Sequence, residues 1–244
     1  MNYAVRPCEE VGEFAGCVAL QKEIWGYSDH DIYPARMFLN ITRMGGHVLG
    51  AFTEEDSMAA FVVSVPAWRK EHRYFYSLLL GVLPGHENQG LGRMLKIAQR
   101  KAALHAGIEY IEWTFDPMRA KNAYFNIVRL GAIVRRYCPD YYGPILGKLQ
   151  RELPSDRLIA EWPLKSARVR NALAGKMPRP PEKKASAKVA IPLDLDSIVS
   201  RKSSEAREWQ ANVRKTLQGC FARKLAITGF ERTESEAYYL LDSI

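Results

Sequence analysis

Residues Leu80–Gly92, LGVLPGHENQGLG, pass from an apolar run through a polar turn into a glycine-flanked segment. The run over 78–83 is apolar on both alternation phases, which is typical of a strand covered on both faces of a sheet. Pro84 ends this strand, because proline has no N–H to donate to a neighbouring strand. The stretch predicts a central strand, a tight turn and a helix that begins at Gly90.

The helix predicted over 90–106 has apolar residues at helical spacing on one face and Arg and Lys on the other. The first N–H groups of a helix have no acceptor within it, and the helix dipole adds partial positive charge at that end. Gly90 and Gly92 carry no Cβ that would hold a ligand away from the backbone. The turn is therefore predicted to bind an anion, and a diphosphate is the best candidate.

Two other phosphate-binding motifs fail on spacing. Gly85 and Gly90 match part of a P-loop, but Leu91-Gly92 stands where that loop needs Lys followed by Ser or Thr. A dinucleotide-binding fingerprint could begin at Gly90, but Leu95 occupies its third glycine position and the preceding strand is antiparallel. A turn that only ends the strand and caps the helix, with no ligand, is the remaining alternative.

The rest of the chain predicts a mixed sheet. Upstream, the patterns indicate a strand at 3–6, helices at 11–25 and 34–44, and strands at 47–52, 58–65 and 74–82. Downstream, they indicate a strand at 108–115, a helix at 120–130, and strands at 132–137 and 158–164. Because a hairpin joins the early strands and helices alternate with the later ones, we expect an α/β fold (α+β mixed sheet) that is antiparallel at its start.

The net charge of +8 is unevenly distributed. Residues 165–244 hold 16 Lys and Arg against 9 Asp and Glu, so this part of the chain carries +7. Pro178, Pro180 and Pro181 interrupt any helix there, and the segment 165–184 has no aromatic residue on which a base could stack. A solvated basic linker is favoured over a nucleic-acid contact.

We therefore expect three parts. These are a large domain at 1–164, a basic, Pro-containing linker at 165–187 and a small C-terminal β-α-β-β lobe at 188–244. The lobe is predicted from strands at 189–193, 226–231 and 238–241 and a helix at 204–223.

The cysteines and the N-terminus indicate a reduced cytoplasm. Cys8, Cys17, Cys138 and Cys220 have neither Cys-x-x-Cys spacing nor close pairing, so neither disulfides nor a structural zinc site is expected. The first residues contain no apolar segment typical of a signal peptide, and no stretch is apolar over the length of a bilayer. The four histidines between 47 and 105 show no metal-ligand spacing, so no metal is predicted.

The order of these elements resembles the GNAT superfamily of N-acyltransferases over about residues 3–164. The segments that carry the resemblance are 80–84, 89–92 with its helix, 113–117 and 122–132, while 141–143 and 154–157 are similar to a branch of predicted acyltransferases. The resemblance implies a GNAT-like acyl-CoA N-acyltransferase fold. It also implies that the turn binds the diphosphate of an acyl-CoA and that the pantetheine arm pairs with the preceding strand.

The cofactor-binding candidates follow from the turn and from the resemblance. They are Val82, Leu83, Asn88, Gln89, Gly90, Leu91, Gly92, Arg93, Asn122 and Asn126. The last two lie four residues apart on one predicted helix face, which suits the pantetheine or the diphosphate. Glu87 differs from the Arg or Gln of the superfamily pattern.

Glu112, on the strand beside the cofactor strand, is the first candidate for the general base, although an ion pair with Arg or Lys would explain it equally well. Many relatives have a tyrosine acid where this chain has Ile127. The acid is therefore expected elsewhere, and Tyr141 is our candidate, with Tyr137 and Tyr142 as the other nearby hydroxyls.

The expected function is transfer of an acyl group, from acetyl-CoA or another acyl-CoA such as succinyl-CoA, to the amine of a small molecule. An amino acid is a plausible acceptor, and the amine would attack directly in a ternary complex. Arg119, Arg135 or Arg136 would pair with the second carboxylate of a succinyl donor. No nucleic-acid or membrane partner is expected, and a homodimer is compatible with the sequence.

Two alternatives belong to other classes. A catalytically silent CoA-binding module with a basic partner-binding tail would bind CoA without turnover. Nucleic-acid binding through residues 165–224 would show a steep dependence on salt.

Overall fold

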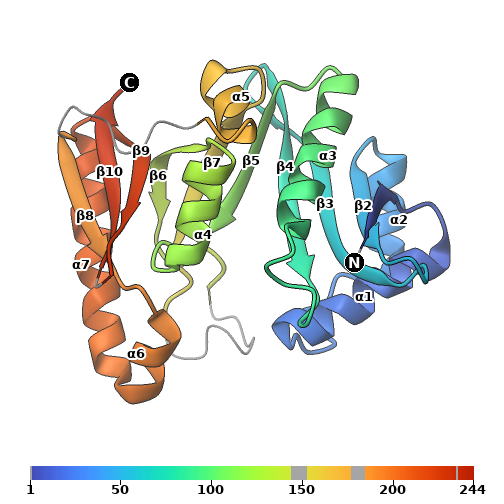
Figure 1. The fold of residues 1–244 in the computed structure, drawn as a ribbon, viewed down its shortest axis with the longest axis horizontal. Coiled ribbons are helices and arrows are strands. Elements are labelled where there is room, and N and C mark those ends of the chain that lie inside the picture. The colour runs from blue at the N-terminus through green and yellow to red at the C-terminus, as the bar shows by residue number, and fades with distance from the viewer. Residues whose placement is uncertain (1, 144–152, 177–184, 235) are drawn as a thin grey trace. The chain divides into compact units, whose positions relative to one another are not determined.

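The computed structural model describes residues 2–143, 153–176, 185–234 and 236–244 (Figure 1). They fall into two compact units, the first ending at Glu112 and the second beginning at Trp113. This division does not coincide with the boundaries predicted near 164 and 187. Each unit is described by itself.

The first unit contains the elements predicted for the N-terminal half. They are β1 (Ala4–Pro7), α1 (Val11–Trp25), α2 (Ala35–Arg43), β2 (His47–Phe52), β3 (Met58–Arg69), β4 (His72–Val82), α3 (Leu91–His105) and the start of β5 (Tyr110–Phe115). The strands lie in the order β1-β2-β3-β4-β5. The first four are antiparallel, and β5 is parallel to β4, as the mixed-sheet prediction requires.

Two apolar clusters hold the helices of the first unit against its strands. Phe14 of α1 and Phe38 of α2 pack with Phe61 and other residues of the sheet. Leu91 and Leu95 of α3 belong to a second cluster, with residues of β2 and β3. Figure 1 shows α3 running alongside β3 and β4.

The hairpin of β3 and β4 is longer than predicted. The predicted strand ends at Val65, just before Pro66, but β3 continues to Arg69. Pairing with β2 ends at Ser64, whereas Pro66 still pairs with Phe75 of β4. Proline is tolerated here because β3 has strand β4 on one side only at this point, so the missing N–H removes no bond on the other side.

A β-bulge interrupts β4. Val63 pairs with Leu79 and Ser64 with Ser77, so Leu78 is an extra residue in β4. The bulge changes the alternation of the strand: Leu78 and Leu79 both belong to the cluster around α1 and α2, whereas Leu80 belongs to the cluster around α3.

The second unit contains a further set of helices and strands. They are the end of β5, α4 (Ala120–Tyr124), the π-helical turn η1 (Phe125–Arg129), β6 (Ile133–Cys138), β7 (Arg157–Pro163), α5 (Ala167–Leu173), β8 (Ala187–Ile191), α6 (Leu195–Arg201), α7 (Ser203–Ala222), β9 (Leu225–Arg232) and β10 (Ala237–Ser243). Five strands follow the order β7-β6-β9-β10-β8. Helix α7 packs against β6, β8 and β9.

The elements predicted for 188–244 are present, with α6 as an additional helix. They do not form a compact unit of their own, because Ile227 of β9 pairs with Val134 of β6. Residues 188–244 therefore share a sheet with the strands that precede the predicted linker.

The linker predicted at 165–187 is partly helical. Ser166 caps α5 by accepting the N–H of Val169, an N-cap signal that the basic composition obscured. Arg168 is partly buried and donates to the carbonyl oxygens of Gly131 and Thr228, so one of the basic residues has a structural role. The three prolines of the predicted linker, at 178, 180 and 181, lie outside the described residues.

Gly131 and Gly175 offer a test of packing in the second unit. Both have a left-handed backbone, with φ of 76° and 71°. A Cβ at Gly131 would lie 2.9 Å from the Cβ of Ala172, whereas a Cβ at Gly175 meets none of the described atoms within 4 Å. We expect Gly175→Ala to cost about 1–2 kcal/mol for its backbone conformation alone.

We expect Gly131→Ala to lower the free energy of unfolding by about 1–3 kcal/mol more than Gly175→Ala, because its new Cβ also overpacks the contact with α5. Urea unfolding of both variants measures the difference. Equal losses of stability would show that α5 does not pack against Gly131 as described.

Candidate functional site

The loop between β4 and α3 has an unusual backbone. The strand ends at Val82, and the N–H of Leu83 donates to the carbonyl oxygen of Ala59 at 2.8 Å. Three of the next residues are left-handed, Gly85 with φ of 90°, Asn88 with φ of 60° and Gly90 with φ of 85°. Asparagine and glycine are the residues that adopt this conformation at least cost, so the sequence specifies the loop.

The N-terminus of α3 carries backbone N–H groups that the helix itself does not satisfy. The carbonyl of Gly90 accepts from Arg93 and Met94, both at 3.0 Å, and no side chain of the described residues caps the helix. The N–H groups of Leu91 and Gly92 lie in the first turn, where a helix offers no acceptor. A Cβ at Gly90 would meet none of the described atoms within 4 Å. This arrangement is a backbone nest suited to an anion.

Side chains from distant parts of the sequence brace the loop. The hydroxyl of Tyr3 lies 2.8 Å from Oε1 of Gln89 and 2.8 Å from Nδ1 of His86. The amide of Gln89 also donates to the carbonyl of Gly85 at 3.3 Å. The side chain of Gln89 thus links Tyr3 to the backbone of the loop. Sequence reasoning missed Tyr3, because no local pattern links it to residues more than 80 positions away.

Within the first unit, β4 has an incompletely paired edge. It pairs with β5 at Phe75–Ile111 and at Tyr76–Glu112. From Ser77 to Val82, β3 is its one strand neighbour among the described residues of this unit. An edge of this kind presents backbone donors and acceptors to an extended partner.

A buried polar cluster connects α3 to the bulge of β4. Lys96 donates to Oγ of Ser77 and to Oε1 of Gln99, both at 2.9 Å. Gln99 in turn donates to Ser64 at 2.8 Å and to Ser77 at 2.9 Å. Ser64 and Ser77 face each other at the register shift. The cluster therefore fixes the helix that begins at Gly90 against the strand that precedes the loop.

Glu112 lies in an ion pair. It is 2% exposed, and its two oxygens accept from the two terminal nitrogens of Arg69, each at 2.6 Å. The Glu112 carboxylate raises the pKa of Arg69, so the guanidinium stays charged. To act as a base, Glu112 would have to give up part of this bidentate pair.

The two asparagines of the predicted cofactor set lie in the second unit and do not share a helix face. Asn122 is exposed, whereas Asn126 is 4% exposed and accepts from Nε1 of Trp113 at 3.1 Å. The prediction assumed a regular α-helix over 120–130. The π-helical turn that begins at Phe125 changes the phase between them.

The tyrosine candidates differ in their surroundings. Tyr141 is 41% exposed, and its ring packs edge-to-face on Tyr142 with centroids 4.7 Å apart. Tyr137 donates its hydroxyl to Asp156. Burial and this carboxylate raise the pKa of Tyr137, which keeps it protonated. The hydroxyl of Tyr142 lies 2.8 Å from Oγ1 of Thr114.

The arginines considered for a second donor carboxylate are engaged. Arg135 and Arg136 pair with Glu161, and Arg119 pairs with Asp196 at 3.0 Å. Asp116, next to Pro117, accepts the N–H of Met118 at 2.8 Å, which is a common turn role of Asp.

The structure thus gathers residues 82–93 of the predicted set on one loop of the first unit, with Glu112 in the same unit. Asn122, Asn126 and Tyr141 belong to the second. Over the described ranges, His, Cys, Asp and Glu form no group suited to a metal ion. Among the described helices, none has the length and apolar character needed to cross a membrane.

No protein-family model matches the sequence, and no curated protein matches it. Solved structures do. A Desulfovibrio desulfuricans protein assigned to the GNAT family of acetyltransferases is 17% identical, with a TM-score of 0.54 over 67% of this chain and 99% of that one. The ribosomal-protein-S18-alanine N-acetyltransferase of Escherichia coli is 16% identical, with a TM-score of 0.52 over 68% and 96%.

A chain of the NatC complex bound to Gag peptide and CoA is also similar, at 16% identity and a TM-score of 0.52 over 67% of this chain and 99% of that one. At these identities the likeness concerns the fold. The chain has the mixed α/β fold of GNAT acetyltransferases.

The buried Lys96 gives stability a predictable pH dependence. Burial lowers the pKa of its amine well below the ordinary value of 10.5. Between the folded-state pKa and the ordinary value, the unfolded chain binds a proton that the folded chain does not, so the free energy of unfolding rises with pH. We expect wild type to gain up to about 1.4 kcal/mol per pH unit over Lys96→Met in this range.

Urea unfolding between pH 6 and pH 10 tests this, with Lys101→Met, an exposed lysine of the same helix, as the matched control. A difference between wild type and Lys96→Met that is constant with pH would contradict the lowered pKa of the buried Lys96 amine.

Proposed function

We propose that this protein, which has the fold of GNAT acetyltransferases, is an acyl-CoA-dependent N-acyltransferase that acts on the amine of a small molecule. The observation that carries the proposal is the backbone nest at the N-terminus of α3, which follows left-handed Gly90 and is called the cradle below. The NatC structure with the same fold was solved with CoA.

The diphosphate of CoA supplies the anion that the cradle suits. The N–H groups of Leu91 and Gly92 donate to its oxygens, and the dipole of the 15-residue helix α3 adds positive potential. Glu87 is exposed on this loop, so its carboxylate has solvent available to it and need not face the phosphates.

The pantetheine arm is an extended amide chain, and the edge of β4 from Ser77 to Val82 offers it backbone partners. This placement brings the thioester toward the bulge at Leu78, where the strand pairing is irregular. A backbone N–H there polarises the thioester carbonyl. The amine nitrogen then attacks the carbonyl carbon, the C–N bond forms, the C–S bond breaks, and CoA leaves as the thiolate.

Two proton transfers complete the reaction. The amine loses a proton to a base, for which Glu112 is the candidate after rearrangement of its pair with Arg69. The thiolate gains a proton from an acid, for which we propose Tyr141, whose side chain is partly exposed. An acetyl donor is favoured over a succinyl donor, because the three arginines considered for a second carboxylate already pair with acidic residues.

The decisive experiment measures thiol release from acetyl-CoA, with propionyl-CoA and succinyl-CoA as comparisons, across a panel of amino acids and other small amines. The proposal requires amine-dependent release and a mass increase of the acceptor by one acyl group. CoA binding by calorimetry with no release from any pair would instead favour the silent CoA-binding module with a basic partner-binding tail. If the protein neither binds CoA nor releases thiol, both the acyltransferase and the silent CoA-binding module are excluded.

Gly90→Ala tests the cradle. The substitution places a Cβ where the diphosphate is proposed to lie, and we expect it to raise the Kd for CoA by about tenfold, the loss of roughly one charge-assisted hydrogen bond. Gly85→Ala is the matched control, because it shares the left-handed backbone and the open surroundings but precedes the helix by six residues.

Pantetheine, which lacks the diphosphate, should bind equally to wild type and to Gly90→Ala. Calorimetry with both ligands makes the comparison. If the two glycine variants weaken CoA binding equally, the diphosphate does not lie on the N-terminus of α3.

Tyr141→Phe tests the acid. Removal of the hydroxyl should lower kcat by about 100-fold while the KM for acyl-CoA changes little, since general acids contribute on this order. Tyr124→Phe, an exposed tyrosine of the same unit, is the control. Steady-state kinetics of both variants give the answer, and an unchanged kcat for Tyr141→Phe would exclude Tyr141 as the acid.

A further inference from the structure

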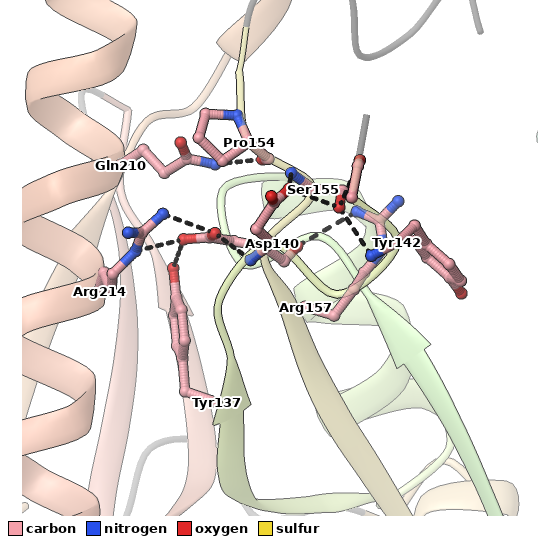
Figure 2. A network of polar contacts seen from close by, with 10 residues as sticks. Tyr137, Asp140, Tyr142, Pro154, Ser155, Arg157, Gln210 and Arg214 are labelled. Atoms are coloured by element: carbon pink, nitrogen blue, oxygen red, sulfur yellow. Dashed lines mark hydrogen bonds and ion pairs between the residues drawn. The ribbon is translucent and has the colours of Figure 1, made fainter. Parts of the chain in front are cut away.

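The turn that carries Tyr141 is tightly bonded. In the four consecutive residues Asp140–Gly143, every backbone N–H has an acceptor. The N–H of Asp140 donates to Asp156, and that of Tyr141 donates to the carbonyl of Ser155. The N–H of Tyr142 donates to the hydroxyl of Ser155 (Figure 2). Three of the four donors therefore depend on two neighbouring residues, Ser155 and Asp156.

Ser155 also bonds to the side chain of Asp140 in the turn, and Asp156 also bonds to Tyr137. Ser155 donates both its N–H and its hydroxyl to Oδ1 of Asp140, each at 3.1 Å. Asp156 is buried to 1% exposure, and besides the N–H of Asp140 its carboxylate accepts the hydroxyl of Tyr137. The turn is thus fixed relative to a charge that is shielded from solvent.

The charge of Asp156 is compensated from helix α7. Arg214 donates from Nε to Oδ2 at 2.8 Å and from Nη2 to Oδ1 at 2.7 Å, a bidentate pair. One helical turn earlier, Gln210 donates to the carbonyl of Pro154 at 2.8 Å. Figure 2 shows both side chains reaching from the helix toward the segment that holds the turn.

These contacts join residues that the sequence placed in separate domains. Arg214 lies in 188–244, whereas Asp156 and the turn lie in 1–164. In the structure both belong to the second unit. A carboxylate buried as deeply as Asp156 keeps its place only while its charge has partners, and among the described residues Arg214 is the cationic side chain that forms an ion pair with it.

We propose that Arg214 is a positioning residue: through Asp156 it sets the conformation of the Asp140–Gly143 turn and hence the placement of Tyr141. The C-terminal residues are then part of the catalytic apparatus and not an independent appendage. The catalytic consequence rests on the proposed function, because it requires Tyr141 to be the acid of an acyltransferase. The anchoring of the turn by Arg214 does not depend on the proposed function.

Hydrogen exchange of the full-length protein tests the anchoring. In Arg214→Met, which keeps the aliphatic stem but removes the charge, we expect the amides of 140–142 to exchange at least about tenfold faster, while those of α3 are unchanged. Arg214→Lys, which keeps the charge but not the fork, should give an intermediate rate and guards against a fold too unstable to measure. Arg207→Met, an exposed arginine of the same helix, should match wild type.

Kinetics test the catalytic consequence. Arg214→Met should lower kcat by about tenfold or more with the Kd for CoA unchanged, and Arg214→Lys should recover part of the loss. When Arg214→Met is added to the Tyr141→Phe variant, kcat should fall little further, since both substitutions act through the hydroxyl of Tyr141.

Unchanged exchange at 140–142 in Arg214→Met would overturn the proposal outright. An altered turn with unchanged kcat in an active enzyme would overturn its catalytic part. If wild type shows no acyl transfer at all, the proposed function fails, and the exchange rates still decide whether Arg214 fixes the turn.

Discussion

The proposed site depends on the backbone at Gly90, where the loop that follows β4 enters α3. Gly90 is left-handed, a Cβ on it would meet none of the described atoms within 4 Å, and the first N–H groups of the helix follow it without acceptors inside the helix. The surroundings support this geometry from two sides. Tyr3 braces the loop through His86 and Gln89, and the buried cluster around Lys96 fixes the helix at the bulge of β4.

Two buried charged or chargeable groups, one in each unit, show the same physical principle. A polar group out of water is tolerated when its hydrogen bonds are complete, and removing one partner of a buried pair commonly costs about 3–5 kcal/mol. Lys96 satisfies this condition within α3, and Asp156 satisfies it beside the Asp140–Gly143 turn. Lys96 and Asp156 both lie where the position of the backbone matters for the proposed chemistry. Directional hydrogen bonds fix that position, whereas apolar packing alone would supply only stability.

Much of the fold could be predicted because local rules determine it. The strand, the glycine turn and α3 follow from alternation, helical spacing and left-handed glycines, and the mixed sheet follows from the order of the elements. What could not be predicted depends on partners distant in the chain. Asn126 turned inward because a π-helical turn breaks the 3.6-residue period, and α5 was hidden by a basic composition that Arg168 uses for buried hydrogen bonds. Glu112 was identified as a strand carboxylate, but its pairing with Arg69 required the extended hairpin beyond Pro66.

The central claim is that the backbone amides at the start of α3 bind the diphosphate of CoA. An amide-resolved NMR titration of the labelled full-length protein with CoA measures this directly. The account predicts the largest saturable shifts at the amides of Gly90, Leu91 and Gly92, and predicts that pantetheine leaves those three amides unshifted. Saturable binding of CoA with shifts confined to other residues, or no shift at any concentration, would contradict it.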